Sequence, residues 1–228
     1  MAVRPVFIPL CDGDHLVRRV DVRFTWVPGM ALSQTRKRIE SLHSAVNSAQ
    51  LGTNALEVST KSTEAVGVAL SAFNLRLRGS DGIELSVESA YQGSKVFALG
   101  GPFHDLYRMS SIHAKQDGRL HASGAIVGFD YFGQRWSISP RSAFYDWLYV
   151  SALARDQSLT KSLERFDCFT DIAFNPNKSF NCQARAVALH MSLRWRGQLD
   201  LALASQTSFL SVLGRVPTLN EDQPDLIG

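Results

Sequence analysis

The residues best suited to chemistry lie in the segment Ser86–Phe97, which carries a carboxylate, an amide and an amine. If this segment is a helix, Glu88, Gln92 and Lys95 stand at positions i, i+4 and i+7, and their side chains project from one face. A carboxylate near an amine can stabilise a developing positive charge, activate water or assist a nucleophile. The same spacing is common on a solvent-exposed helix, so spacing alone leaves both interpretations open. Gly93 weakens such a helix by roughly 1 kcal/mol relative to Ala, which indicates close approach of a ligand or of another part of the chain.

The elements that must position this segment are indicated by hydrophobic periodicity. Alternation predicts a strand over Val20–Val27, and β-branched and aromatic residues predict another over Ala125–Phe132. A short strand is expected over Leu56–Lys61. Helices are expected over Ser33–Ala49 with Ser33 as N-cap, from Ser86 to the Gly100-Gly101-Pro102 turn, over Phe144–Ala154 and over Arg185–Leu193. Strands and helices in no regular alternation predict an α+β fold, rich in helix and with a small sheet.

Composition excludes several classes of protein. Hydrophobic residues make up 45% of the chain and charged residues 20%, which is enough for a buried core. The apolar runs fall short of the ~20 residues of a membrane span, and the N-terminus lacks a secretory signal, so we expect a cytoplasmic protein. Cys11, Cys168 and Cys182 lie far apart and are odd in number, which fits a reducing compartment. The formal charge of +3 permits contact with nucleic acid but does not demand it.

The chain is expected to form one domain. The six histidines show no metal-ligand spacing, so we expect neither a metal nor a cofactor. We find no internal repeat, and no domain boundary stands out before Pro217. Residues 1–215 are therefore predicted to form the domain, and residues 216–228, which are polar and acidic, a loose tail.

The segment around Glu88 resembles the signature of the NADAR (YbiA-like) family. That signature is an apolar-Ser-x-Phe/Asn element followed by Thr-Val-Glu-x-x-x-Gln-x-x-Lys-Phe. Here Leu70–Leu75 matches the first element; Ser86 takes the Thr position, and Ser89 stands where relatives often have His. Val96-Phe97 replaces a Phe directly after the Lys. Further matches follow in Ala114–Arg119, Thr170-Asp171, Asn181 and Gln183, with Ile172-Ala173 in place of the usual Trp-Gly.

The rest of the chain resembles a narrower branch, the NADAR antitoxins associated with DarT-type DNA ADP-ribosyltransferase toxins. The matching segments are Arg4–Phe7, Trp26–Gly29, Leu42-His43, Leu56–Ser62, Gly100–Pro102, Phe144–Tyr149 and Phe174–Ser179. The resemblance covers roughly Arg4 to Leu193 and implies a single compact NADAR/YbiA-like domain.

The resemblance implies an N-glycosidase that removes ADP-ribose from guanine in DNA and so reverses a DarT-type toxin. The expected substrate is single-stranded or flipped-out ADP-ribosylated DNA, because a stacked guanine hides the modified atom from a pocket. ADP-ribose would be the product, the toxin the functional partner, and no membrane is involved. Two alternatives stay open: an N-glycosidase acting on a small ribosylated metabolite of the riboflavin-precursor type, and a non-catalytic ADP-ribose reader or toxin-binding antitoxin.

Roles for individual residues follow from the same resemblance. Glu88 is expected to stabilise positive charge on the ribose or to activate water, with Asp171 as its partner. Lys95 has two possible functions, binding of the diphosphate or attack on the ring-opened sugar to give a Schiff base. Substrate contacts are expected from Phe73, Asn74, Tyr91, Gln92, Arg119, Asp146, Trp147 and Asn181. For Asp146 and Trp147 a purely structural place in the core is the alternative.

Overall fold

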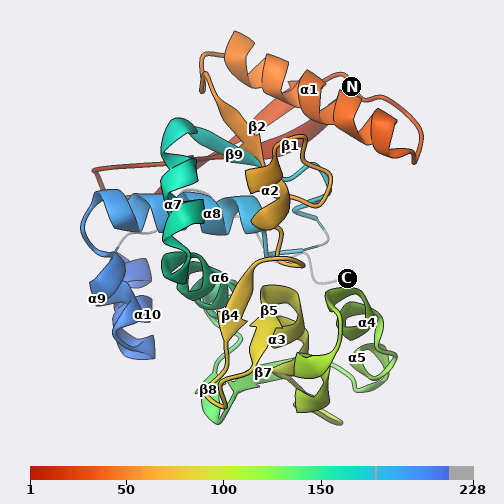
Figure 1. The fold of residues 1–228 in the computed structure, drawn as a ribbon, viewed down its shortest axis with the longest axis vertical. Coiled ribbons are helices and arrows are strands. Elements are labelled where there is room, and N and C mark those ends of the chain that lie inside the picture. Colours follow the sequence, from red (N-terminus) through yellow and green to blue (C-terminus); the bar gives the residue numbers. More distant parts are fainter. Residues whose placement is uncertain (178, 216–228) are drawn as a thin grey trace.

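The computed structural model describes residues 1–177 and 179–215, and it has an α+β fold in which short sheets surround a helical centre (Figure 1). The tail predicted for residues 216–228 lies outside the described residues. A four-stranded sheet has the order β2-β1-β9-β3. Its strands are β1 (Ala2–Pro9), β2 (Val17–Phe24), β3 (Ala55–Glu57) and β9 (Cys168–Thr170). The β3 and β9 strands are parallel, whereas β1 runs antiparallel to both of its neighbours.

Two smaller sheets complete the strands. One is the hairpin of β4 (Arg76–Arg78) and β5 (Glu84–Ser86), and the other has the order β6-β7-β8. The strands of the latter are β6 (Lys95–Phe97), β7 (Ile126–Tyr131) and β8 (Gln134–Trp136).

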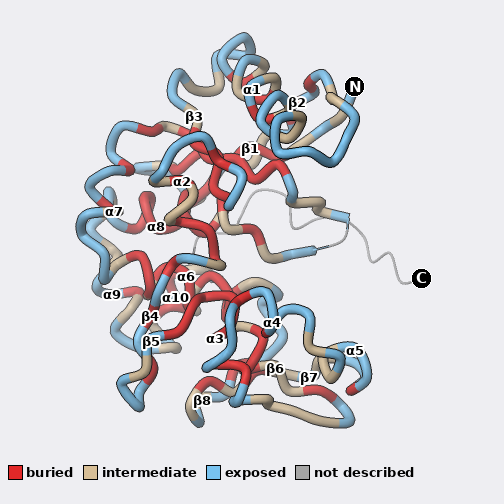
Figure 2. Tube along the Cα trace, turned by 45° about the vertical axis from the view of Figure 1, so that its right-hand side comes forward, coloured by how far each residue is buried: buried red, intermediate tan, exposed pale blue. Residues whose placement is uncertain are grey.

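The helices form the centre of the molecule and cover its ends. In chain order they are α1 (Leu32–Ser48), α2 (Ala65–Ala69), α3 (Val87–Gly93), η1 (His104–Arg108), α4 (Ser111–Gln116), α5 (Arg119–Ala122), α6 (Ala143–Arg155), α7 (Gln157–Ser162), η2 (Leu163–Arg165), α8 (Gln183–Trp195), α9 (Leu199–Leu203) and α10 (Gln206–Arg215). The buried segments concentrate in α6, α8 and β1, while α1 is exposed along much of its length (Figure 2). None of the helices in the described part of the chain is long and apolar enough to cross a membrane.

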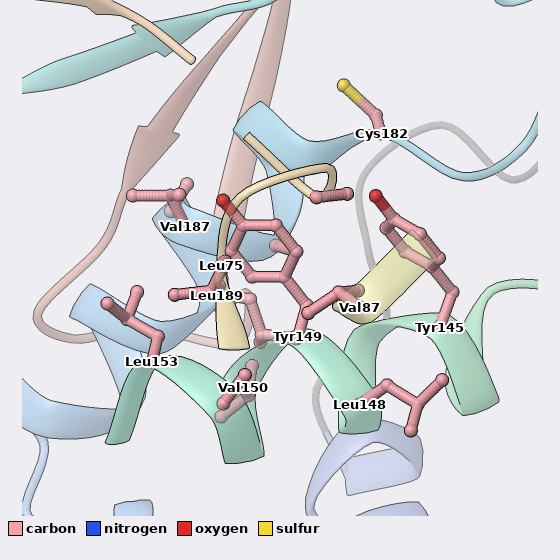
Figure 3. Close-up of a cluster of buried hydrophobic side chains, with 14 of the residues drawn as sticks. Leu75, Val87, Tyr145, Leu148, Tyr149, Val150, Leu153, Cys182, Val187 and Leu189 are labelled. Atoms are coloured by element: carbon pink, nitrogen blue, oxygen red, sulfur yellow. The ribbon is translucent and has the colours of Figure 1, made fainter. Parts of the chain in front are cut away.

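The α6 and α8 helices pack against each other and make the main core. Tyr145 and Tyr149 project from the same side of α6, with ring centroids 6.1 Å apart (Figure 3). The Tyr149 hydroxyl donates to the backbone carbonyl of Leu70, so this hydroxyl has a hydrogen-bond partner although an apolar cluster surrounds it. Cys182, at the start of α8, is buried in the same cluster.

Most predicted elements are confirmed, with shifts at their ends. The strand expected over Val20–Val27 lies at Val17–Phe24. The prediction of Ser33 as N-cap is wrong, because α1 begins at Leu32 and its N-cap is Ala31. β1 was not predicted. The helix expected to run from Ser86 to the Gly100-Gly101-Pro102 turn is wrong, because α3 ends at Gly93.

The chain leaves the helix there because it pairs with β7. The amide of Asp130 donates to the Ser94 carbonyl at 2.7 Å, and Lys95 pairs with Phe129 across the sheet. Lys95 is thus the first residue of a strand rather than the eighth position of a helical face.

Candidate functional site

Glu88 lies in the first turn of α3, which is fixed at both its cap and its backbone. The Ser86 hydroxyl accepts from the amide of Ser89 at 3.0 Å, an N-cap that typically contributes about 1 kcal/mol. The amide of Glu88 donates to the carbonyl of Ala72 at 2.9 Å, which ties α3 to the turn after α2. A carboxylate is favoured at this position because the first turn of a helix presents unpaired backbone amides.

The Glu88 carboxylate is buried, with 6% of the residue exposed, and it lies among cations and an amide. Gln92 donates through Nε2 to Glu88 Oε1 at 2.9 Å. The Nζ atom of Lys115, from α4, lies 3.6 Å from the same oxygen. Lys95 is close enough for its charge to interact with Glu88 as well. One carboxylate therefore faces two amines.

The two amines differ in their environment. Burial lowers the pKa of Lys95 to about 8; the Glu88 charge opposes that shift and the Lys115 charge adds to it. The Lys95 Nζ lies 4.8 Å from the centroid of the Tyr91 ring. Lys115 is more than half exposed, and its Nζ lies 5.1 Å from the centroid of the Phe73 ring. Lys95 therefore gives up its proton at a lower pH than an ordinary lysine and can more readily supply a free amine.

Asp171 follows β9 and is held by the start of α8. Its Oδ1 accepts from the amides of Ala173 and Phe174, and its Oδ2 accepts from Gln183 Nε2 at 3.1 Å. Gln183 Oε1 in turn accepts from the amide of Ala72 at 2.9 Å. Because the carbonyl of Ala72 accepts from the backbone amide of Glu88, Gln183 connects the Asp171 carboxylate to the backbone at Glu88. Burial raises the pKa of Asp171 to about 6, and the Lys115 charge works against that shift.

Two buried acceptor atoms at the site have no hydrogen-bond partner within the described residues. They are Gln92 Oε1 and Asn181 Oδ1. The side chain of Asn181 lies close enough to the Tyr91 hydroxyl to lower the pKa of that hydroxyl, against the larger rise caused by burial, so its amide stands beside the ring that packs against Lys95. Buried acceptors without donors are rare in proteins, and they fit a ligand that brings its own N–H or O–H groups.

The structure thus brings together six of the predicted site residues. These are Phe73, Glu88, Tyr91, Gln92, Lys95 and Asn181, joined by Asp171 through Gln183.

The other predicted residues have structural partners of their own. Asn74 is exposed and donates to the carbonyl of Val68 at 2.8 Å. Arg119 forms ion pairs with Asp105 at 2.6 Å and with Asp117 at 2.9 Å. A diphosphate at Arg119 would have to compete with both carboxylates.

Asp146 and Trp147 are packed in or against the hydrophobic core. Asp146 is fully buried and forms an ion pair with Arg185 of α8. Trp147 packs against Trp136 with ring centroids 5.2 Å apart. A direct role of either residue in substrate binding stays a prediction.

Sequence reasoning missed two residues of this cluster, Lys115 and Gln183. Both occur in the segments that carry the family resemblance, at Ala114–Arg119 and after Asn181, and that resemblance is the signal that could have pointed to them. Their roles depend on contacts between α3, α4 and α8, which spacing within one segment cannot reveal.

The side chain of Glu57 is a second buried carboxylate, and it lies close to Asp171. It accepts from the hydroxyls of Ser59 at 2.8 Å and Thr170 at 2.7 Å and from the amide of Ile172 at 3.0 Å. Burial and the nearby Asp171 charge raise the pKa of Glu57 to about 8. The amide of Ile172 is adjacent to Asp171, so Glu57 holds the backbone on which that carboxylate stands.

Two glycines shape the backbone around the site. A Cβ at Gly93 would lie 2.6 Å from the Tyr107 ring, so the missing side chain makes room for η1 rather than for a ligand. Gly101 has φ +76°, and a Cβ there would lie 2.5 Å from the carbonyl oxygen of Lys95. The Gly100-Gly101 pair is thus a turn that packs against the backbone of Lys95.

Within the described residues, no group of three or more His, Cys, Asp or Glu side chains could hold a metal ion.

Comparison with known protein families identifies a match over nearly the whole chain. The model of a family described as DarT1-associated NADAR antitoxin matches residues 2–223, which is nearly the whole chain. No curated protein matches the sequence.

Proposed function

The chain belongs to the family of DarT1-associated NADAR antitoxins, and from this premise we propose that it hydrolyses the N-glycosidic bond between ADP-ribose and guanine in DNA. The observation that carries the proposal is a buried carboxylate, Glu88, that faces one amine of lowered pKa and one exposed ammonium group. N-glycoside cleavage needs these groups, because positive charge develops at the anomeric carbon and a nucleophile must reach it.

The lowered pKa favours Lys95 as the nucleophile. A proton from water moves to the ring oxygen of the ribose, the ring opens, and the anomeric carbon becomes doubly bonded to the guanine nitrogen; that proton returns to water when the sugar is released as the aldehyde. The free amine of Lys95 attacks the anomeric carbon, the Glu88 carboxylate takes a proton from the attacking nitrogen, and Glu88 then delivers this proton to the guanine nitrogen as the bond to guanine breaks. The carbon is then held as a Schiff base on Lys95. Water activated by Glu88 adds to it, and ADP-ribose and the free amine are released, with one water consumed.

Lys115 and the unpaired acceptors account for binding. The exposed ammonium group of Lys115 suits the diphosphate as a point charge. Gln92 Oε1 and Asn181 Oδ1 can accept from guanine N–H groups or ribose hydroxyls. Tyr91 and Phe73 offer ring faces, and recognition of a base in this way requires single-stranded or flipped-out DNA.

The test is a release assay on a single-stranded oligonucleotide that carries ADP-ribosylated guanine. The wild type is expected to restore the plain oligonucleotide and free ADP-ribose, and Glu88→Gln is expected to lower the rate at least about a hundredfold. Lys161→Ala, an exposed lysine on α7, serves as the control with an unchanged rate. Release by Glu88→Gln at the wild-type rate would rule out the assigned mechanism.

Trapping tests the covalent step separately. Borohydride added during turnover should link ADP-ribose to the wild type and to Lys115→Ala, but not to Lys95→Ala, as read by protein mass. An adduct on Lys95→Ala would assign the nucleophile elsewhere. If the wild type leaves the oligonucleotide unchanged but acts on a free ribosylated pyrimidine, the DNA substrate is wrong and the small-metabolite alternative holds.

A further inference from the structure

A basic hollow separate from the Glu88 cluster lies between the β4–β5 hairpin and the end of α6. Its volume is about 470 Å³. The residues that line it are Arg76, Leu77, Arg78, Glu84, Ala152, Arg155, Asp156 and Gln157. Three guanidinium groups from two elements thus face two carboxylates. All three arginines are exposed.

Several other arginines in the described part of the chain have a carboxylate partner, whereas these three have none. The paired ones include Arg19 with Asp21, Arg119 with Asp105, Arg165 with Glu64 and Arg194 with Glu164. Within the described residues, Arg76 and Arg155 form no ion pair, and the hydrogen bond of Arg78 is from Nε to the carbonyl of Gly82 at 3.2 Å.

The two carboxylates of the hollow offset only part of the charge of its three arginines, so the hollow stays positive. Asp156 accepts from the amide of Leu159 at 2.9 Å as the N-cap of α7. Glu84 stands directly opposite Arg78 in the hairpin, yet the two side chains form no ion pair within the described residues. Like charges gathered in one hollow without partners fit an anionic ligand with several charges.

The hairpin connects this hollow to the candidate site. Phe73, beside Lys115, precedes Arg76 by three residues, so their Cα atoms are at most about 11 Å apart. At the other end of the hairpin, β5 runs into α3, and the amide of Val87 donates to the carbonyl of Leu75 at 3.0 Å. Arg76 pairs with Ser86 across the hairpin, and Ser86 lies two residues before Glu88, so the hairpin links the hollow directly to the start of α3.

We propose that Arg76, Arg78 and Arg155 bind backbone phosphates of the DNA strand that flanks the modified guanine. This inference rests on the proposed function, because only a substrate longer than one nucleotide brings such phosphates. Phosphate contacts hold and orient a strand without reading its sequence, and guanidinium groups suit them. The hollow then makes the enzyme act better on a strand than on an isolated nucleoside.

Binding of an unmodified, fluorescently labelled single-stranded oligonucleotide tests this without catalysis. The fluorescence anisotropy is measured at several salt concentrations. For Arg76→Ala/Arg155→Ala the affinity should fall about tenfold, and the slope of log K against log salt should become shallower by about 1.4, or ~0.7 for each lost contact. Arg76→Lys/Arg155→Lys keeps both charges and should keep the slope. Glu84→Gln removes a repulsive carboxylate and should tighten binding two- to threefold, or about 0.5 kcal/mol.

The matched control is Arg18→Ala/Arg23→Ala, which removes two exposed arginines from β2 in the other half of the molecule (Figure 1). Its affinity and salt slope should equal those of the wild type. If the β2 control weakens binding as much as the hollow variant does, or if neither changes it, the assignment of the phosphates to the hollow is overturned.

A kinetic comparison separates this inference from the proposed function. The Arg76→Ala/Arg155→Ala variant should have a KM about tenfold higher than the wild type for an ADP-ribosylated oligonucleotide. Its turnover of ADP-ribosylated guanosine should be unchanged. An equal loss on both substrates would mean that the hollow binds ADP-ribose or supports the fold, which contradicts the inference. If DNA binding depends on the hollow but ADP-ribose is never released, the proposed function fails and the phosphate site stands.

Discussion

At the scale of single residues, Lys95 is the group whose protonation decides how the candidate site works. Its pKa is lowered to about 8 by burial, and the free amine is the form that attacks carbon. We therefore expect kcat/KM to rise with pH through about 8 and to level off above it. If Lys95 instead binds the diphosphate, the charged form is required, and kcat/KM must fall as the pH passes about 8. A pH–rate profile on the ADP-ribosylated oligonucleotide distinguishes the two.

The Lys115→Gln variant gives a second prediction about Lys95, namely the direction in which its pKa changes. The Lys115 charge lowers the pKa of Lys95, so its removal should raise that pKa and move the ascending limb of the profile to higher pH. The control is Lys61→Gln, an exposed lysine outside the cluster, which should leave the limb in place. A limb that does not move in Lys115→Gln would show that Lys95 is not the titrating group.

The chemistry of single residues was partly predictable from the sequence. Glu88 and Gln92 lie on one helical face as their spacing predicted, and Gln92 donates to Glu88. Lys95 reaches the same place by another route, since it begins a strand. Lys115 was not predicted, because its distance of 3.6 Å from Glu88 arises from the packing of α4 on α3 and leaves no periodic pattern in the sequence.

At the scale of elements, Gly93 determines how closely η1 packs on α3. A Cβ there would lie 2.6 Å from Tyr107, a residue of η1 that is itself fixed by a 2.8 Å hydrogen bond to Ser94. Gly93→Ala should therefore lower the free energy of unfolding by about 1–3 kcal/mol through overpacking. Gly118→Ala is the matched control, because no atom lies within 4 Å of its added Cβ and the effect should be slight or stabilising. Equal denaturant midpoints for the two variants would contradict this account.

Elements with a long apolar face were the ones that the sequence predicted well. The helices expected over Phe144–Ala154 and Arg185–Leu193 form α6 and α8, each within two residues of the expected ends. β1 escaped prediction because Pro5 and Pro9 interrupt it and its central residues are buried on both faces, so it shows no alternation. Buried strands of this kind gain their stability from neighbours distant in the sequence, here β2 and β9.

At the scale of the whole molecule, His190 marks the point where α6, α7 and α8 meet. It is fully buried in α8, and Nε2 lies 3.5 Å from Thr160 Oγ1 of α7. Burial lowers the pKa of His190 to about 4. Because the folded pKa lies below the unfolded value of 6.5, the neutral ring contributes stability above pH 6.5 that is lost as the pH falls toward 4.

His190→Gln should therefore be destabilised most near neutral pH. Its deficit in the free energy of unfolding should shrink by about 1 kcal/mol or more in acid, since one pKa unit corresponds to about 1.4 kcal/mol. His121→Gln, at an exposed position, should differ little from the wild type throughout. Thermal unfolding of both variants at several pH values measures this, and a deficit that grows in acid would contradict the assignment of a neutral buried ring.

Whether the molecule acts by catalysis or by binding determines how much of it must be present to counteract a toxin. An antitoxin that hydrolyses ADP-ribose from DNA turns over, so a small fraction of one equivalent should clear all the modified oligonucleotide, given time. An antitoxin that acts by binding alone must match its toxin mole for mole. We expect the wild type to protect modified DNA far below stoichiometry and Glu88→Gln to fail at the same dose. Titration against a DarT1-type toxin, with the modified fraction read by mass, measures this. Protection that begins only near one equivalent and survives Glu88→Gln would mean that the Glu88 cluster binds ADP-ribose without cleaving it.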